Sequence, residues 1–283
     1  MVGHNGLKLR MLLAGSILFM FYAAIAGFVF LSFGTGTPIL LAVALGSIGF
    51  VGFQYKFGKW MALRSVGAEE MPEGNRYNRI HRSVESLSSD MDIDKPRLMV
   101  AKMGVPNAFA VGRKGAGVVV VSQEIIDLLN HDELEGVLAH ELAHVKNRDV
   151  VMMVVGQSIA SLVGLAVQFA YFFGGEQNFG SYIVGMVLGT VAQMIVSIFV
   201  MAISRYREYV ADRDAAEYTN NPDAMARALE KISAGAKNKE MRGENTVNAL
   251  CIFGSSGSLI KRIFSTHPPT EERISRLRSM DAY

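Results

Sequence analysis

The sequence predicts a mostly α-helical membrane protein with four transmembrane helices and an α+β domain that contains a small β-sheet. Of its 283 residues, 50% are hydrophobic, and many of these gather in four uncharged runs, at 11–33, 38–55, 151–173 and 183–204. As helices, all four runs are long enough to cross the roughly 30 Å hydrocarbon core of a bilayer. Four such runs in one chain disfavour the alternative that they are buried helices of a soluble core. The segments outside them are charged and combine helical periodicity with β-rich stretches.

The apolar runs divide the chain into four predicted parts. Residues 1–64 hold two N-terminal transmembrane helices with their flanks, and residues 151–204 form a transmembrane hairpin. Residues 65–150 and 205–283 are the polar parts that together build the α+β domain. The first run lacks a small-residue cleavage site and a second run follows it, so we interpret it as a retained span rather than a signal peptide.

Lysine and arginine residues are distributed unequally between the two sides of the predicted spans. The loops at 34–37 and 174–182 contain neither residue type. The positive-inside rule therefore predicts a multi-pass protein of the cell membrane whose termini and polar domain are cytoplasmic. The charges at the opposite ends of the spans are Lys8, Arg10, Lys56, Lys59, Arg64, Lys146, Arg148, Arg205 and Arg207.

The composition excludes several classes of protein. A net charge of +2 and the lack of any nucleic-acid-binding pattern argue against a nucleic-acid partner. Cys251 is the single cysteine, so neither an internal disulfide nor a cysteine-rich metal site can form. Metal ligands must therefore come from the six histidines and from carboxylates. The four spans hold no charged residue, which disfavours a transporter.

Residues 65–150 are expected to hold a helix, a strand, a β-hairpin and further helices. Helical periodicity predicts the first helix at 75–91, and β-rich composition predicts a strand at 97–102. Two more β-rich runs, at 107–113 and 117–121, flank a turn and indicate a hairpin. Ser122 is then a candidate N-cap for a short helix.

The pattern H-E-x-x-H occurs at residues 140–144, within the apolar stripe of a predicted helix. In a helix, His140 and His144 lie one above the other on one face, so their imidazoles can share one metal ion. Glu141 can take the proton of a water molecule at that metal, which is the geometry of a zinc peptidase. A surface helix with two solvated histidines is the alternative that the pattern alone leaves open. We expect this helix to continue directly into the span at 151–173.

Two helices are predicted after the fourth span. The first starts at Asn221-Pro222, with the proline at its first position, and is expected to end at Gly235. The second is amphipathic and covers residues 270–280, with Ile274 and Leu277 facing inward.

A catalytic zinc needs a third protein ligand, for which Glu208 is the candidate. Glu208 follows the fourth span and His144 precedes the third, so both groups would stand roughly 6–10 Å above the same membrane face. Asp212, one helical turn further, would accept the spare ring N–H of a ligating histidine. A solvated charged face, paired with Arg205 or Arg213, explains the same spacing equally well.

Four features together resemble the HtpX-type membrane zinc metalloproteases, a family related to the CAAX prenyl proteases. They are His-Glu-Leu-Ala-His at 140–144, the spans on both sides, Arg-Glu-Tyr-Val-Ala-Asp at 207–212 and Thr-His-Pro-Pro at 266–269. The resemblance covers nearly the whole chain, in order. It implies a gluzincin-like peptidase domain facing the cytoplasm, with Glu208 as the third ligand of one zinc ion and Asp212 as a residue that supports a ligand.

The resemblance also implies roles for His267 and for one strand. His267 belongs to a family motif and would stabilise the tetrahedral oxyanion, although bracing of the following proline turn explains it equally well. A short, exposed strand edge would hold an extended peptide by main-chain hydrogen bonds, whereas an internal strand paired on both edges is the alternative. The residues that resemble the family's substrate-binding strand are Asn107, Ala108, Phe109 and Ala110.

The expected function is therefore a zinc-dependent endopeptidase with Glu141 as general base. Its expected substrates are membrane proteins or unfolded polypeptides, cleaved on the cytoplasmic side of the bilayer as part of membrane protein quality control. A zinc-stabilised membrane scaffold or adaptor without proteolytic activity is the alternative. The intact Glu141 argues against that alternative, because a structural zinc site needs no base.

Overall fold

The computed structural model describes residues 37–74, 76–175, 178–241 and 267–280. The described residues form two compact units, one within Met1–Gly58 and Ser158–Gln193, the other within Lys59–Gln157 and Met194–Tyr283. The first predicted span, at 11–33, lies outside the described residues. The second, at 38–55, lies within the single helix α2 (Thr37–Ser65).

Helices α6 (Asp149–Gly174) and α7 (Phe179–Thr219) are long and apolar enough to cross a membrane, by length and composition. Within the first unit they approach closely, since a Cβ atom added to Gly164 would stand 2.8 Å from the carbonyl oxygen of Gly189. Gln193 donates a hydrogen bond to Ser161 across the pair, at 3.3 Å. Small residues and a buried amide are typical of contacts between transmembrane helices, where polar groups must find partners inside the protein.

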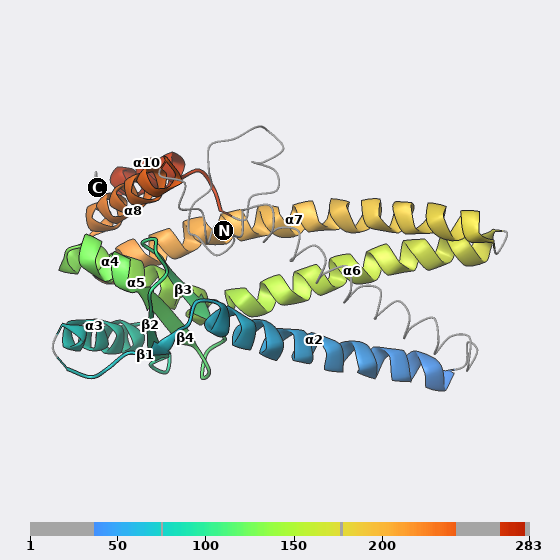
Figure 1. The fold of residues 1–283 in the computed structure, drawn as a ribbon, viewed down its shortest axis with the longest axis horizontal. Helices are drawn as coiled ribbons and strands as arrows, with labels where there is room; N and C mark the ends of the chain where they lie inside the picture. The colour runs from blue at the N-terminus through green and yellow to red at the C-terminus, as the bar shows by residue number, and fades with distance from the viewer. Residues whose placement is uncertain (1–36, 75, 176–177, 242–266, 281–283) are drawn as a thin grey trace. The chain divides into compact units, whose positions relative to one another are not determined.

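The second unit is built around a four-stranded sheet (Figure 1) with the order β1-β2-β4-β3. The strands β3 (Ala108–Val111) and β4 (Val118–Ser122) pair antiparallel, which confirms the predicted hairpin. Strand β2 (Arg97–Ala101) runs parallel to β4, and β1 (Glu69–Glu70) pairs antiparallel with β2. All five residues of β4 are buried, as expected for a strand with neighbours on both sides. Strand β3 is left at the edge of the sheet.

Helices cover one face of this sheet and form the main core. The core includes alternate residues of the strands, such as Ala108, Val119 and Val121, packed against the helices. Helix α8 lies alongside both α5 and α10. The helices are α3 (Tyr77–Asp90), α4 (Gln123–Leu128), α5 (His131–Lys146), α8 (Pro222–Met241) and α10 (Thr270–Met280).

The start of α5 is fixed by a buried carboxylate. Asn130 caps the helix by accepting the Glu133 amide hydrogen at 2.9 Å, and the Glu133 side chain accepts the Asn130 amide at 3.0 Å. This reciprocal capping box satisfies two of the free amides of the first turn. Glu133 is 1% exposed and also accepts a 2.7 Å hydrogen bond from Lys231 of α8. The helix that carries His140 is thereby held in place against α8.

Two sequence-based expectations about helix ends were wrong. Helix α5 does not continue into α6: Asn147 caps it, Arg148 takes a left-handed conformation with φ 57°, and α6 begins at Asp149. Helix α8 does not end at Gly235 but continues to Met241. A Cβ atom at Gly235 would stand 3.3 Å from the ring of Pro106, so the glycine serves a close approach rather than a helix end.

Candidate metal centre

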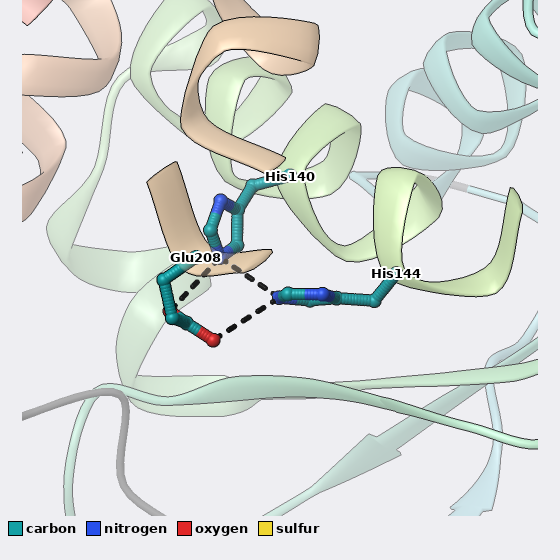
Figure 2. A group of neighbouring side chains, drawn as sticks. All are labelled: His140, His144 and Glu208. Carbon is teal, nitrogen blue, oxygen red and sulfur yellow. Dashed lines mark hydrogen bonds and ion pairs between the residues drawn. The ribbon is translucent and has the colours of Figure 1, made fainter. Parts of the chain in front are cut away.

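His140 and His144 of α5 and Glu208 of α7 point toward one another (Figure 2). The two Nε2 atoms are 3.2 Å apart. Oε2 of Glu208 lies 3.7 Å from Nε2 of His140, and Oε1 lies 3.5 Å from Nε2 of His144. Four atoms bonded tetrahedrally to zinc at about 2.0–2.2 Å stand about 3.3–3.6 Å from one another. The three side chains therefore have the spacing of three ligands around one such ion.

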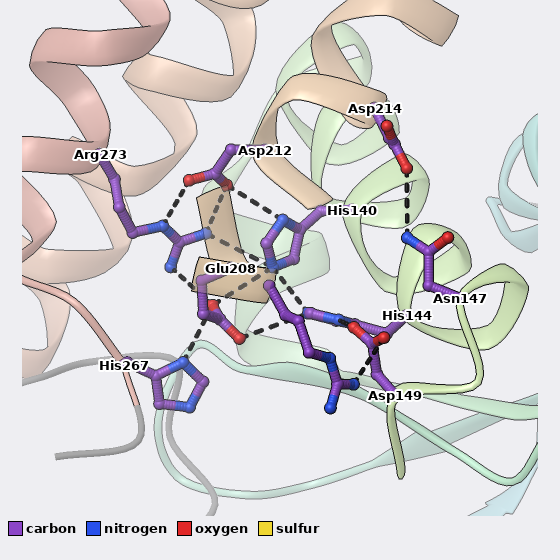
Figure 3. Close-up of polar contacts among 10 residues, drawn as sticks. His140, His144, Asn147, Asp149, Glu208, Asp212, Asp214, His267 and Arg273 are labelled. Carbon is purple, nitrogen blue, oxygen red and sulfur yellow. Dashed lines mark hydrogen bonds and ion pairs between the residues drawn. The ribbon is translucent and has the colours of Figure 1, made fainter. Parts of the chain in front are cut away.

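The remaining ring nitrogens fix how the two imidazoles are protonated. Nδ1 of His140 lies 3.0 Å from Asp212, and Nδ1 of His144 lies 2.6 Å from Asp149 (Figure 3). With the protons on the Nδ1 atoms, beside the two carboxylates, each ring turns the lone pair of Nε2 toward the other ring. Two lone pairs facing each other at 3.2 Å need a cation between them. The donor set therefore fits a bound metal ion.

Burial and charge act in opposite directions on the ligand side chains. Burial lowers the pKa of His140, but the hydrogen bonds with Asp212 and Glu208 outweigh it and raise the pKa to about 9. Burial lowers the pKa of His144. A metal ion held between the rings would need both Nε2 atoms deprotonated, because metal ligands bind in their deprotonated form.

Arg273 completes the surroundings of His140. Its guanidinium forms two hydrogen bonds with the Asp212 carboxylate, at 2.8 and 2.6 Å, and a third nitrogen stands 3.4 Å from Glu208. The side chain is fully buried. Burial lowers the pKa of Arg273, but the carboxylate of Asp212 outweighs it and raises the pKa above its usual value. The permanent charge of Arg273 makes it possible to bury Asp212 and Glu208 beside each other.

Glu141 lies on the sheet side of the ligand set and is 3% exposed. Burial raises the pKa of the Glu141 carboxyl, while the two histidines and a hydrogen bond from the Ala110 main chain lower it in part. A carboxylate with a raised pKa is a better proton acceptor near neutral pH. The edge strand β3 is thus in direct contact with the residue expected to act as base.

The register of β3 shows which of its main-chain groups face away from the sheet. The carbonyl of Asn107 accepts the Ser122 amide at 2.8 Å, and the Asn107 amide donates to the Ser122 hydroxyl at 2.9 Å. Main-chain groups alternate along a strand, so Phe109 also pairs with β4, whereas Ala108 and Ala110 face outward. The contact between Ala110 and Glu141 agrees with this assignment. The main-chain groups of Ala108 and Ala110 thus point away from β4, although Ala108 is buried and the Ala110 main chain contacts Glu141.

His267 lies next to the ligand set. Its Nδ1 stands 3.0 Å from Oε2 of Glu208, and 27% of its side chain is exposed. The ring is therefore close enough to reach a group bound at the metal while remaining accessible to solvent. This position is compatible with the oxyanion role implied by the family resemblance.

The structure brings together all the predicted residues of the metal centre. His140, Glu141, His144, Glu208 and Asp212 are all in or beside one buried cluster, and Glu208 and Asp212 are 5% and 4% exposed. The two carboxylates therefore do not form a solvated face. Three contributors were missed by sequence analysis, namely Asp149, Arg207 and Arg273. Arg273 precedes Leu277 by four residues, so its place on the buried face of α10 could have been noticed.

The fold and the site together define a metalloprotease of the membrane. A largely buried His-His-Glu group is flanked by a glutamate that contacts the edge strand β3, and Glu208 lies on an apolar helix long enough to cross a bilayer. The chain belongs to peptidase family M48, whose sequence profile matches residues 75–281.

Two relatives show how similar this sequence is to other members of the family. A protease HtpX homolog of Halobacterium salinarum is 51% identical, covering 95% of this chain and 100% of the relative. A protease HtpX homolog of Pyrococcus abyssi is 39% identical, covering 78% of both chains. These similarities confirm the predicted membership of the HtpX-type metalloproteases.

The crystal structure of Ste24p from S. mikatae has the same fold. It superposes with a TM-score of 0.61 at 20% sequence identity, covering 96% of this chain. This chain spans 64% of the length of that protein. At this identity, the similarity supports the fold alone.

We predict that Glu208→Ala strongly weakens metal binding, because the variant keeps only two of three ligands. Asp212→Asn should cause a milder loss of about 10–100-fold, as is typical when a group supporting a ligand is changed. The measurement is metal content and chelator competition on detergent-purified protein. Full metal occupancy of Glu208→Ala under chelator challenge would remove Glu208 from the ligand set.

Proposed function

We propose that this metalloprotease is a zinc endopeptidase that cleaves membrane proteins or misfolded polypeptides on the cytoplasmic side of the membrane, in membrane protein quality control. One observation carries the proposal: the buried base Glu141 lies beside the His-His-Glu group and contacts the edge strand β3. Such a strand edge accepts an extended main chain of almost any sequence. Broad acceptance of unfolded segments is what a quality-control peptidase needs.

The ligand chemistry supports one zinc ion per chain. Two imidazoles and one carboxylate are a common donor set for catalytic zinc, which keeps a fourth position open. When bound there, zinc would supply a Lewis acid that polarises a peptide carbonyl and makes a water molecule more acidic. His140, His144 and Glu208 would hold the ion, while Asp212 would orient His140 through its Nδ1 atom.

Glu141 would carry the proton through the reaction. Its carboxylate would accept a proton from the attacking water and later deliver that proton to the nitrogen of the leaving amine. His267, beside Glu208, would donate a hydrogen bond to the oxyanion of the tetrahedral intermediate. A partly exposed histidine suits this role, because it can approach the substrate without displacing a ligand.

The place of Glu208 along α7 supports a site next to the bilayer. Helix α7 is one 41-residue helix, and its apolar run at 183–204 ends four residues before Glu208. At about 1.5 Å per residue, the ligand would lie roughly 6 Å beyond the apolar run. Substrate segments emerging from the membrane would therefore be within reach. The four apolar runs predict four spans, and the distribution of lysine and arginine predicts that both termini and this site are cytoplasmic.

We predict that Glu141→Gln retains zinc and loses proteolysis, because the three ligands remain while proton transfer is removed. A loss of about 10²–10⁴-fold is expected for a general base. The assay is incubation of the detergent-purified protein with an unfolded membrane protein, with and without a zinc chelator. Cleavage by the variant at the parental rate would show that Glu141 is not the base. Self-cleavage of the parent that is absent in the variant would support the assignment.

Proline substitutions test whether β3 holds the substrate. Ala108→Pro removes an outward amide and should lower kcat/KM about 5–10-fold, the effect of one lost hydrogen bond. Phe109→Pro removes an amide directed at β4 and should instead lower thermal stability. Ala110→Pro should lower the rate of cleavage and also disturb the position of Glu141, since the Ala110 main chain contacts that side chain. A folded, zinc-loaded Ala108→Pro variant with unchanged kcat/KM would contradict the proposed role.

Cysteine labelling in intact cells tests the orientation. In a Cys251→Ser background, an impermeant reagent should label a cysteine at position 178, in the loop without positive charge, from outside. It should not label a cysteine at position 237, in the polar part after α7. The reverse pattern would place the metal centre on the outer side and overturn the cytoplasmic assignment.

A further inference from the structure

Asp149, the first residue of α6, links a metal ligand to an arginine. Its Oδ2 lies 2.6 Å from Nδ1 of His144, and its Oδ1 lies 2.6 Å from the Arg207 guanidinium. Asp149 is 5% exposed, so both of its charge-assisted contacts are made out of solvent. Arg207 directly precedes the ligand Glu208 in α7. The contacts therefore connect the end of α5, the start of α6 and α7 at the metal centre.

The break between α5 and α6 is what brings Asp149 to His144. Asp149 follows His144 by five residues, and in an unbroken helix it would be rotated away by about 140°. The left-handed conformation of Arg148, with φ 57°, turns the chain back so that the carboxylate meets the ring. A left-handed arginine is disfavoured locally, so its presence at this junction requires compensation by other contacts.

The two ligand histidines have equivalent surroundings. Nδ1 of His140 lies 3.0 Å from Asp212, which pairs with Arg273. His144 donates through Nδ1 to Asp149, which pairs with Arg207 (Figure 3 shows the carboxylates beside their rings). Each of these two series of contacts thus links a ligand histidine, a buried carboxylate and an arginine. The family resemblance implies the first carboxylate, whereas the second was not expected.

We infer that Asp149 is a positioning residue for His144 and that Arg207 holds Asp149 in place. The carboxylate keeps the proton of His144 on Nδ1 and the lone pair of Nε2 directed at the metal, which is how supporting carboxylates act on ligating histidines. This inference rests on the proposed ligand set. A purely structural role is the competing explanation, since an acidic residue in the first turn of α6 also stabilises that helix through its dipole.

The deciding experiment measures metal binding rather than activity. The background is the 283-residue chain, purified in detergent and carrying Glu141→Gln to prevent self-cleavage. In this background, Asp149→Ala should lower the zinc affinity about 10–100-fold, as measured by chelator competition. The visible absorption spectrum of the Co²⁺-substituted protein, which reports ligand geometry, should change as well. Asp149→Asn, which keeps an acceptor oxygen, should restore part of the zinc affinity and part of the parental spectrum. Arg207→Gln should lower the affinity and change the spectrum in the same direction as Asp149→Ala.

Asp214→Ala is the matched control. Asp214 is 8% exposed and accepts a 3.2 Å hydrogen bond from Asn147, so it ties the same junction to α7 without contacting a ligand. This variant should keep the zinc affinity and the Co²⁺ spectrum of the parent even if its thermal stability falls. A purely structural role of Asp149 would instead make the two alanine variants behave alike.

The outcomes separate this inference from the proposed ligand set. If the parent binds no zinc, or if His144→Ala retains it, the ligand set fails. If His144→Ala loses zinc while Asp149→Ala keeps both the affinity and the spectrum of the parent, the positioning role is overturned. Should Asp149→Ala fail to fold, Asp149→Leu decides, because it keeps a branched side chain but offers no acceptor oxygen: a parental affinity and spectrum would overturn the role.

Discussion

Four carboxylates are buried around His140 and His144, and their charge is the constraint on which the surrounding structure depends. Glu141, Asp149, Glu208 and Asp212 are each 5% exposed or less. Unpaired carboxylates at that depth would cost several kcal/mol each. Arg207 and Arg273 supply two positive charges against these four negative ones, which leaves a difference of two (4 − 2 = 2). With all four carboxylates ionised and both rings neutral, a divalent cation at the facing Nε2 atoms would match that difference.

This charge balance explains why elements distant in sequence converge. Helix α5 supplies the rings, α7 supplies Glu208 and Asp212, and α10 supplies Arg273, which meets Asp212 in two hydrogen bonds. None of these segments could bury its charged residue alone. The packing of α10 against α8, and of α8 against α5, closes the arrangement on the side away from the strand edge.

The sheet contributes what substrate binding requires, an edge strand beside the base Glu141. Strand β4 is buried between two neighbours, so only β3 can offer free main-chain groups near α5. The hydrogen bonds of Asn107 with Ser122 set the alternation, and Ala108 and Ala110 face outward as a result. A substrate strand placed there would lie along the same edge that contacts Glu141. The register of β3 against β4 thus sets both the main-chain groups that would bind the substrate and the contact with the base Glu141.

Sequence reasoning succeeded where the signal is local and periodic. The hairpin, the cap at Ser122, the proline start of α8 and the final helix follow from turn chemistry and apolar periodicity. It failed at Gly235, where a glycine that allows contact with Pro106 was mistaken for a helix end. It also failed at Arg148, because a left-handed arginine has no composition signal.

The sequence by itself determined the pair of histidines on one helical face, the base between them and the apolar runs, since these depend on spacing along the chain. Spacing made Glu208 and Asp212 candidates, and the resemblance to the HtpX-type proteases favoured them over a solvated charged face. Only the tertiary structure decided that Asp149 and Arg273 support the two rings and that β3 is an edge. Those contacts join residues separated by a break in a helix or by most of the domain. Long-range packing and the balance of buried charge, rather than local preference, bring them together.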